Sequence, residues 1–206
     1  MHSSAHYRQL LARLPQIAVA ADQFQVLNSA KDFKSRILSL IAGATQRIYL
    51  IALYLQDDEA GREILSALYA AKQRNPALDI KVFVDFHRAQ RGLIGKGKQG
   101  GNHLMYQAMA ARHEHQIEIY GVPVKGRELL GVLHLKGFIF DDILLYSGAS
   151  LNDIYLHQQE RYRFDRYHQI HSQALTCSMV NYVDDVFLKS EAVQRLDRPG
   201  IPGAKQ

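Results

Sequence analysis

Residues 134–141 read HLKGFIFD and residues 148–152 read GASLN, and most of what this chain builds depends on these two segments. The apolar run over 132–140 is rich in β-branched and aromatic side chains, which predicts a strand. Side chains alternate between the faces of a strand, so His134 and Lys136 are expected to point the same way. An imidazole attacks phosphorus or protonates a leaving oxygen, and an ammonium neutralises charge on a phosphate oxygen. The pair predicts a phosphodiester site, or half of one.

The residues after this strand extend the predicted site. Asp141 is expected to turn the chain into a second strand over 143–147, which makes a hairpin. Its carboxylate suits a turn former that bonds local backbone better than it suits chemistry. Gly148 and Ser150 are expected to let the backbone approach a phosphate, and Asn152 is expected to contact the same phosphate.

The spacing of these residues, His-x-Lys-x4-Asp-x6-Gly-x3-Asn, resembles the motif of the phospholipase D superfamily. The resemblance implies four catalytic residues: His134, Lys136, Asp141 and Asn152. It also implies chemistry without a cofactor or a metal ion. Many members carry Gly-Ser where this chain has Gly-Ala, so Ser150, one position later, is expected to offer its hydroxyl to the phosphate.

A catalytic histidine also needs a carboxylate that holds its tautomer and stabilises the imidazolium. The superfamily places this carboxylate downstream, at the start of a strand. Asp165 opens the alternating segment 165–170 and is the first candidate. Glu160 is nearer to the motif but lies in a more polar segment, so it is the second candidate.

Six longer strings carry a narrower resemblance. They are IALYL (51–55), VDFHRAQRG (84–92), YGVPV (120–124), GVLHLKGF (131–138), YSGASLND (146–153) and YRFDRYH (162–168). Together they resemble the N-terminal half of the bacterial phospholipase D-type phosphatidylserine synthases. That resemblance implies transfer of a phosphatidyl group from CDP-diacylglycerol to L-serine, with release of CMP. It also implies a phosphatidyl-histidine intermediate, for which His134 is either the nucleophile or its acid–base partner.

That family carries two such motifs in one polypeptide, and this chain carries one. Residues 1–190 are expected to form a single phospholipase D-like domain. Residues 191–206 are rich in proline and glycine and are expected to start a linker to an absent second half. Either the chain is a fragment with an inert half-site, or two copies pair about a twofold axis as a homodimer.

Two other functions fit the same motif. One is phosphatidyl transfer to glycerol 3-phosphate, as in phosphatidylglycerophosphate synthases, whose enzymes share a similar Gly-Ala-x-Leu segment. Only product analysis separates it from transfer to serine. The other is a dimeric phosphodiesterase or nuclease with one motif per chain, which tight, salt-dependent DNA binding would favour.

The order of predicted elements indicates an α/β layered fold, with a mostly parallel central sheet flanked by helices and a β-hairpin that carries the motif. Helices are expected after Ser29 and after Asp57 or Asp58, and also over residues 102–112. The predicted strands before the hairpin cover residues 47–55, 79–85 and 116–120. Ligands gather beyond the carboxyl ends of strands in such sheets.

Residues 87–101 leave the predicted sheet at such a strand end. This segment places four cations, including Lys96 and Lys98, among five glycines. Since the planar fork of arginine suits phosphate oxygens, Arg88 and Arg91 are expected to hold the pyrophosphate of CDP-diacylglycerol. The alternative is a solvated, flexible loop.

The charge and hydropathy of the chain suit an anionic partner. The net charge is +5 and the sequence pI is near 9.3, which fits a nucleotide, nucleic acid or an acidic membrane surface. The apolar run over 48–55 is far shorter than the roughly 20 residues that cross a bilayer, and no signal peptide is recognisable. We expect a cytoplasmic chain, peripherally associated with the inner face of the membrane. Residues 6–17, with three leucines and two arginines, are expected to form a helix that lies on lipid or packs on the core.

Overall fold

The structure, a computed structural model, describes residues 4–91, 100–124 and 131–200. Its centre is an eight-stranded sheet in the order β1-β7-β6-β5-β2-β3-β4-β8. Of the strand pairs in these residues, β2–β3 and β3–β4 are parallel and the other five are antiparallel. The layered α/β class and the motif hairpin are confirmed. The expectation of a mostly parallel sheet is wrong, because the hairpin strands and both edge strands join the sheet antiparallel.

Two groups of strands build this sheet. The parallel group consists of β2 (Arg47–Ile51), β3 (Asp79–Asp85) and β4 (Glu118–Val122). The antiparallel group consists of β5 (Gly137–Phe140), β6 (Ile143–Tyr146) and β7 (Tyr167–His171). Strand β2 pairs with β5 and joins the two groups. The edges are β1 (Phe24–Leu27) beside β7 and β8 (Gln194–Arg195) beside β4.

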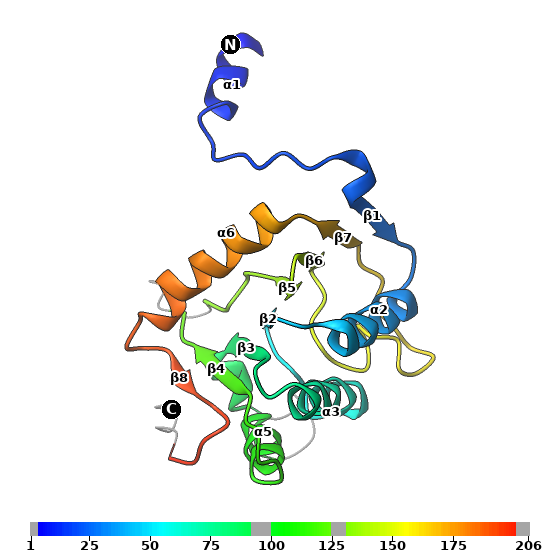
Figure 1. Ribbon diagram of the computed structural model, residues 1–206, viewed down its shortest axis with the longest axis vertical. Helices are drawn as coiled ribbons and strands as arrows, with labels where there is room; N and C mark the ends of the chain where they lie inside the picture. Colours follow the sequence, from blue (N-terminus) through cyan, green and yellow to red (C-terminus); the bar gives the residue numbers. More distant parts are fainter. Residues whose placement is uncertain (1–3, 92–99, 125–130, 201–206) are drawn as a thin grey trace.

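Helices cover both faces of the sheet (Figure 1). One face packs against α2 (Ala30–Gly43), α3 (Glu59–Arg74) and α5 (His103–Ala110), and the other packs against α6 (Gln173–Val183). The shorter helical elements are α1 (Ser4–Leu11), η1 (Ala21–Gln23), α4 (Phe86–Ala89) and η2 (Asp184–Leu188).

The starts of the long helices follow from capping side chains. The side chains of Ser29, Asp58 and Ser172 each accept a hydrogen bond from the backbone N–H of the residue three positions later. This bond satisfies one of the free donors of the first helical turn. The predicted helix starts at Ser29 and at Asp58 are therefore confirmed.

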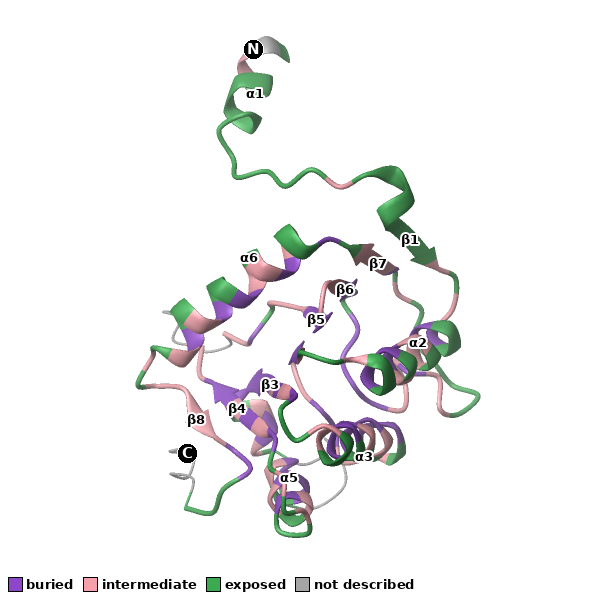
Figure 2. Ribbon diagram, in the orientation of Figure 1, coloured by how far each residue is buried: buried purple, intermediate pink, exposed green. Residues whose placement is uncertain are grey.

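Two buried clusters hold the layers together (Figure 2). Alternation along β2 sends Ile48 and Leu50 toward α2 and α3, and Tyr49 and Ile51 toward α6. All four side chains are at most 3% exposed. Burying an aliphatic side chain of this size contributes about 1.5–3 kcal/mol, so the central strands anchor both layers.

Strand β5 begins at Gly137, later than the predicted start at residue 132. Gly137 has φ +151°, a conformation that L side chains rarely adopt, and a β-carbon there would lie 2.7 Å from Cε of Met179. Residues 131–136, just upstream of this glycine, do not pair with the sheet. His134 and Lys136 therefore lie on the loop that leads into the strand, not on the strand itself.

Asp141 forms the turn after β5. It has φ +50°, and its carboxylate accepts hydrogen bonds from the backbone N–H groups of Thr45, Gln46 and Arg47 at 2.8–2.9 Å. The Thr45 hydroxyl donates a fourth bond at 3.1 Å. The predicted turn role of Asp141 is thus built from long-range bonds to the entry of β2, which fix the β2–β5 register.

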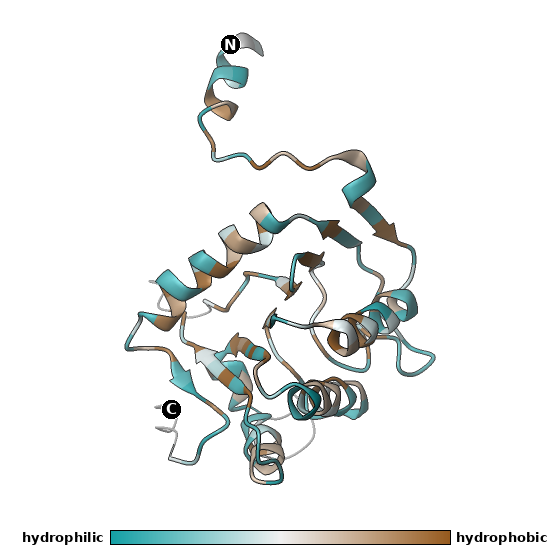
Figure 3. Ribbon diagram, viewed as in Figure 1, coloured by the Kyte–Doolittle hydropathy of each residue, from teal (hydrophilic) through white to brown (hydrophobic). Residues whose placement is uncertain are grey.

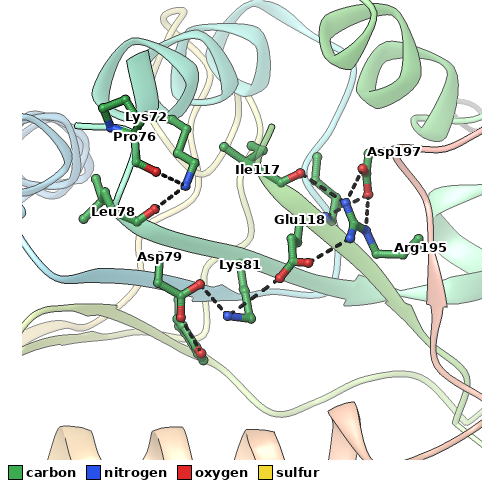
Figure 4. A network of polar contacts seen from close by, with 11 residues as sticks. Lys72, Pro76, Leu78, Asp79, Lys81, Ile117, Glu118, Arg195 and Asp197 are labelled. Carbon is green, nitrogen blue, oxygen red and sulfur yellow. Dashed lines mark hydrogen bonds and ion pairs between the residues drawn. The ribbon is translucent and has the colours of Figure 1, made fainter. Parts of the chain in front are cut away.

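The far edge of the sheet is closed by a charged network (Figure 4). Arg195 on β8 donates to Glu118 at 2.8 Å and to Asp197 at 2.6 Å, and Asp197 accepts the N–H of Ile119 at 3.0 Å. Leu196 between them is fully buried. The folded domain therefore reaches at least Asp197, and the predicted boundary at residue 190 falls too early. Residues 201–206 of the predicted tail lie outside the described residues.

The N-terminal helix stands away from the layered body (Figure 3). Leu10, Leu11 and Leu14 are 46–59% exposed, so α1 does not pack on the core as a surface helix would. No helix within the described ranges is both long enough and apolar enough to cross a membrane.

Candidate active site

Most of the predicted site residues gather at the edge of the sheet where the parallel strands end. Strands β2, β3, β4 and β6 end at this edge, and β5 and β7 begin there, as the pairing of Ile51 with Gly137 and the register of β6 with β7 show. The loops that carry His134, the segment 147–153 and Asp165 start from this common edge. In open α/β sheets, ligands bind beyond strand ends of this kind.

Lys136 is half-buried, and its ammonium nitrogen donates to the carbonyl oxygen of Leu133 at 3.2 Å. Burial lowers the pKa of Lys136, and the nearby carboxylate of Asp85 acts in the opposite direction. His134, two residues earlier, is exposed. The loop thus offers a positioned cation and an accessible imidazole, the two groups that phosphoryl transfer uses.

Asp85, which the sequence interpretation missed, fixes this loop. It is fully buried, and its carboxylate accepts the N–H of Leu133 at 2.9 Å and the N–H of Arg88 at 2.8 Å. The last residue of β3 therefore holds the loop just before His134 and also caps α4. The available signal was an acidic residue at the end of an apolar strand, immediately before the cationic segment.

Asn152 is held from two sides and is 9% exposed. Its side-chain oxygen accepts the N–H of Tyr155 at 2.9 Å, and its Nδ2 donates to the hydroxyl of Tyr54 at 3.3 Å. Leu151 forms a parallel bridge with Leu55. The glycine-rich segment is thereby tied to the chain that leaves β2.

Tyr54 is a second residue that the sequence interpretation missed. The guanidinium carbon of Arg88 lies 5.4 Å from the centre of its ring. Burial raises the pKa of the Tyr54 hydroxyl, and Arg88 opposes this shift. Arg88, Tyr54 and Asn152 thus form one cluster from three separate segments. A tyrosine after an apolar strand is common in protein cores, so the sequence carried little signal for it.

Asp165 lies against the glycine-rich segment, two residues before β7. A β-carbon on Gly148 would be 2.8 Å from Oδ2 of Asp165, so the carboxylate lies close to the backbone of this glycine. Gly148 is exposed, whereas Ser150 is 3% exposed. The carboxylate and the exposed backbone of the segment therefore face the same edge, and the Ser150 side chain lies beneath it.

A pair of carboxylates braces the segment from below. Asp58 accepts the N–H of Asp153 at 2.9 Å, and Asp153 accepts the N–H of Ala60 at 2.7 Å. Burial and, to a smaller extent, the charge of Asp153 outweigh the backbone hydrogen bonds of Asp153 and Gly61, and together these effects raise the pKa of Asp58 to about 6. The start of α3 is thereby locked to the residue after Asn152.

One predicted residue, Asp141, stands apart from this cluster. Asp141 lies at the opposite end of β5 and bonds the backbone before β2. Arg91 is exposed, and Glu160 is also exposed. Of the other predicted cations, Lys96 and Lys98 lie outside the described residues.

The chain shares this layered α/β fold with proteins of known structure. No protein-family model matches the chain. NucT from Helicobacter pylori shares the fold, with a TM-score of 0.54 at 13% identity over 79% of this chain and 92% of that one. The crystal structure of phosphatidylserine synthase from Haemophilus influenzae is far more similar, with a TM-score of 0.90 at 45% identity over 98% of this chain and 45% of that chain.

The sequence comparisons agree with this structural match. The chain is 48% identical to CDP-diacylglycerol–serine O-phosphatidyltransferase of Haemophilus influenzae over 203 residues, which is 96% of this chain and 44% of that protein. It is 46% identical to the Escherichia coli enzyme, over 97% and 45% respectively. The resemblance to bacterial phosphatidylserine synthases is confirmed. The chain spans about half the length of the curated relatives that it matches.

Proposed function

We propose that the chain takes part in phosphatidyl transfer from CDP-diacylglycerol to L-serine, which yields phosphatidylserine and CMP. The observation that carries this proposal is the 46–48% identity, over almost the whole chain, to two enzymes named for that reaction. The gathering of His134, Lys136, Asn152 and Asp165 at one sheet edge supports it, because phosphoryl transfer needs a nucleophile and positioned charge in one place.

In the proposed reaction, a ring nitrogen of the nucleophilic histidine attacks the phosphorus of the phosphatidyl group and the P–O bond to CMP breaks. CMP leaves with the electron pair and takes a proton from a neighbouring acid. The serine hydroxyl then attacks the phosphorus and gives its proton to a base, while the P–N bond breaks and frees the imidazole. His134 is this nucleophile or the acid–base group opposite it.

The other groups would stabilise charge and hold the substrate. Lys136 and Asn152 would contact the non-bridging phosphate oxygens, and the backbone at Gly148 would approach them closely. Asp165 would hold the imidazole tautomer. Ser150, buried beneath the segment, would support the segment or offer its hydroxyl to the phosphate.

Two arginines are proposed for the pyrophosphate of the substrate. Arg88 lies over Tyr54 beside Asn152, within the cluster, and Arg91 follows one turn later, where its N–H donates to the carbonyl oxygen of Arg88 at 3.3 Å. A planar guanidinium binds two phosphate oxygens at once. We expect Arg91→Ala to weaken binding of CDP-diacylglycerol.

We propose that the chain supplies half of a two-histidine site, since it carries one motif and a phosphoryl transfer of this kind needs a nucleophile and a separate acid. The second half would come from a longer polypeptide or from a second copy of the chain. We also propose peripheral association with an anionic membrane on its cytoplasmic side. The net charge of +5 and the exposed leucines near α1 support this association.

The test is incubation of the purified chain with CDP-diacylglycerol labelled in its phosphatidyl group, with L-serine, with glycerol 3-phosphate or with neither. We expect label on the protein without an acceptor, and labelled phosphatidylserine with serine, from an assembly of two chains. Transfer of label to glycerol 3-phosphate alone would show that the acceptor is glycerol 3-phosphate and not L-serine. A folded monomer that binds the substrate without taking up label would be an isolated half-site.

A further inference from the structure

A pocket of about 270 Å³ opens between α6 and the loop that carries the motif. It is lined by Ile51, Leu135, Ser178, Met179, Tyr182 and Val183. Carbon and sulfur dominate this lining, and among the described residues no charged side chain contributes to it. Ile51 and Val183 form a fully buried floor, and Ser178 and Tyr182 lie at an exposed rim.

The position of the pocket relates it to the candidate active site. Leu135 lies between His134 and Lys136 in the sequence, on the loop that leads into β5. Ile51 is the last residue of β2, at the edge where the site lies. The pocket and the phosphate-binding side chains therefore flank the same short loop.

Gly137, where the motif loop meets β5, faces Met179 of α6. A β-carbon at this position would meet Cε of Met179 at 2.7 Å. The unbranched, flexible side chain of Met179 suits a wall that adapts to a ligand of variable length. The glycine that ends the motif loop thus also shapes the pocket.

We infer that this pocket takes the first part of one acyl chain of the lipid whose phosphate binds at His134 and Lys136. This inference rests on the proposed function. An apolar pocket binds an acyl chain by the hydrophobic effect, and the ester-linked chains of a diacylglycerol begin only a few bonds from its phosphorus. The pocket lies just below the usual 300–1,000 Å³ of small-ligand sites, so it accommodates part of one chain and not two.

The test measures binding of three soluble ligands to the full chain by calorimetry: CDP-glycerol, CDP-dibutyrylglycerol and CDP-dihexanoylglycerol, each below its micelle concentration. One buried chain gains about fourfold in affinity per methylene. Two added methylenes therefore predict roughly 15-fold tighter binding of the dihexanoyl than of the dibutyryl ligand. If both chains were buried, the gain would be roughly 200-fold, which would overturn the assignment to one chain.

Ser178→Trp places a bulky ring at the rim of the pocket. We expect it to remove the 15-fold gain and to leave the affinity for CDP-glycerol unchanged. Asn181→Trp is the matched control, because Asn181 is exposed on the same helix and does not line the pocket. Circular dichroism checks that both variants fold.

The alternative results are distinct. Equal affinity for the two lipids, or an equal loss in both tryptophan variants, would overturn the acyl pocket and leave the proposed function intact. A dimer in sedimentation that Ser178→Trp alone dissociates would show that a second copy covers the pocket, against the inference. Failure of CDP-glycerol and of both lipids to bind would remove the proposed function and the inference with it.

Discussion

The two ends of strand β5 carry residues of one sequence motif but perform different tasks. At the amino end, His134 is exposed and Lys136 donates to one loop carbonyl group. At the carboxyl end, Asp141 accepts four hydrogen bonds from residues 45–47. A four-residue strand with a rise of about 3.3 Å per residue keeps the two ends more than ~10 Å apart.

The pKa shifts of Lys136 and Asp141 also distinguish the two ends of β5. Burial lowers the pKa of Lys136, which makes its charged form less stable than it would be in water. Burial alone would raise the pKa of Asp141, but the backbone N–H groups and the Thr45 hydroxyl outweigh it and hold this pKa below its usual value. The amino end of β5 therefore keeps His134 and Lys136 available for a ligand, whereas the charge of Asp141 at the carboxyl end stabilises the fold.

The largest expected effect comes from His134→Ala, at the amino end of β5. We expect no detectable phosphatidyl-enzyme from this variant, because removal of a catalytic nucleophile or its acid–base partner typically costs more than about 10³-fold in rate. His171→Ala is the matched control, since His171 is exposed at the end of β7, at the opposite edge. Persistence of protein-bound label in His134→Ala would refute the role of His134.

Asp165→Asn and Asp141→Asn make the same chemical change at opposite edges. We expect Asp165→Asn to slow formation of the intermediate by about 10²–10⁴-fold without loss of folded structure, because the imidazole loses its orienting carboxylate. Single-turnover labelling across pH separates this effect from a structural one. An equal rate loss in Asp141→Asn would contradict the division between the two edges.

Asp141→Ala tests the structural end of the comparison. Loss of the four hydrogen bonds and retention of φ +50° are expected to lower the free energy of unfolding by roughly 2 kcal/mol. Denaturant unfolding measures this change, and affinity for CDP-glycerol should be preserved. Because the pKa of Asp141 in the folded protein is below its ordinary value of 3.8, its carboxylate stabilises the fold at pH values above 3.8. This contribution is lost as the pH falls through the folded pKa. A normal stability in Asp141→Ala would remove its structural role.

The last prediction concerns Asp58, beneath the site. Burial raises its pKa from 3.8 to about 6, so the folded protein binds this proton more tightly than the unfolded chain does. This carboxyl therefore makes the free energy of unfolding decrease as the pH rises from about 4 to about 6. Asp58→Asn should flatten the profile over that range in denaturant titrations. An unchanged profile would show that Asp58 does not titrate in this range.

The parts of the fold that the sequence predicted well have strong local signals. Ser29 and Asp58 cap helices whose apolar residues repeat with helical period, and the strand over residues 79–85 has the predicted bounds. The hairpin was predictable because Asp141 separates two apolar runs. Pairing direction has no local signal, which is why the sheet proved more antiparallel than predicted.

The candidate site was harder to predict where it depends on long-range contacts. His134, Lys136, Gly148 and Asn152 share one spaced pattern, so their roles were proposed together. Asp85 and Tyr54 belong to other segments, and long-range contacts such as the β2–β5 pairing and the Leu55–Leu151 bridge bring them to the motif. The start of β5 was misplaced because nothing local shows that Asp85 takes the N–H of Leu133 out of a strand.

The pairing of β2 with β5 also couples ligand binding at the site to the stability of the sheet. Tyr54 and Arg88 follow strands of the parallel group, whereas His134 and Lys136 precede β5 and Asn152 follows β6 in the antiparallel group. A nucleotide bound by both groups opposes their separation, and at 100 times its Kd it adds about 2.7 kcal/mol to the free energy of that opening. Amide hydrogens between β2 and β5 would then exchange more slowly with solvent, and occupancy of the site would be readable from the centre of the sheet.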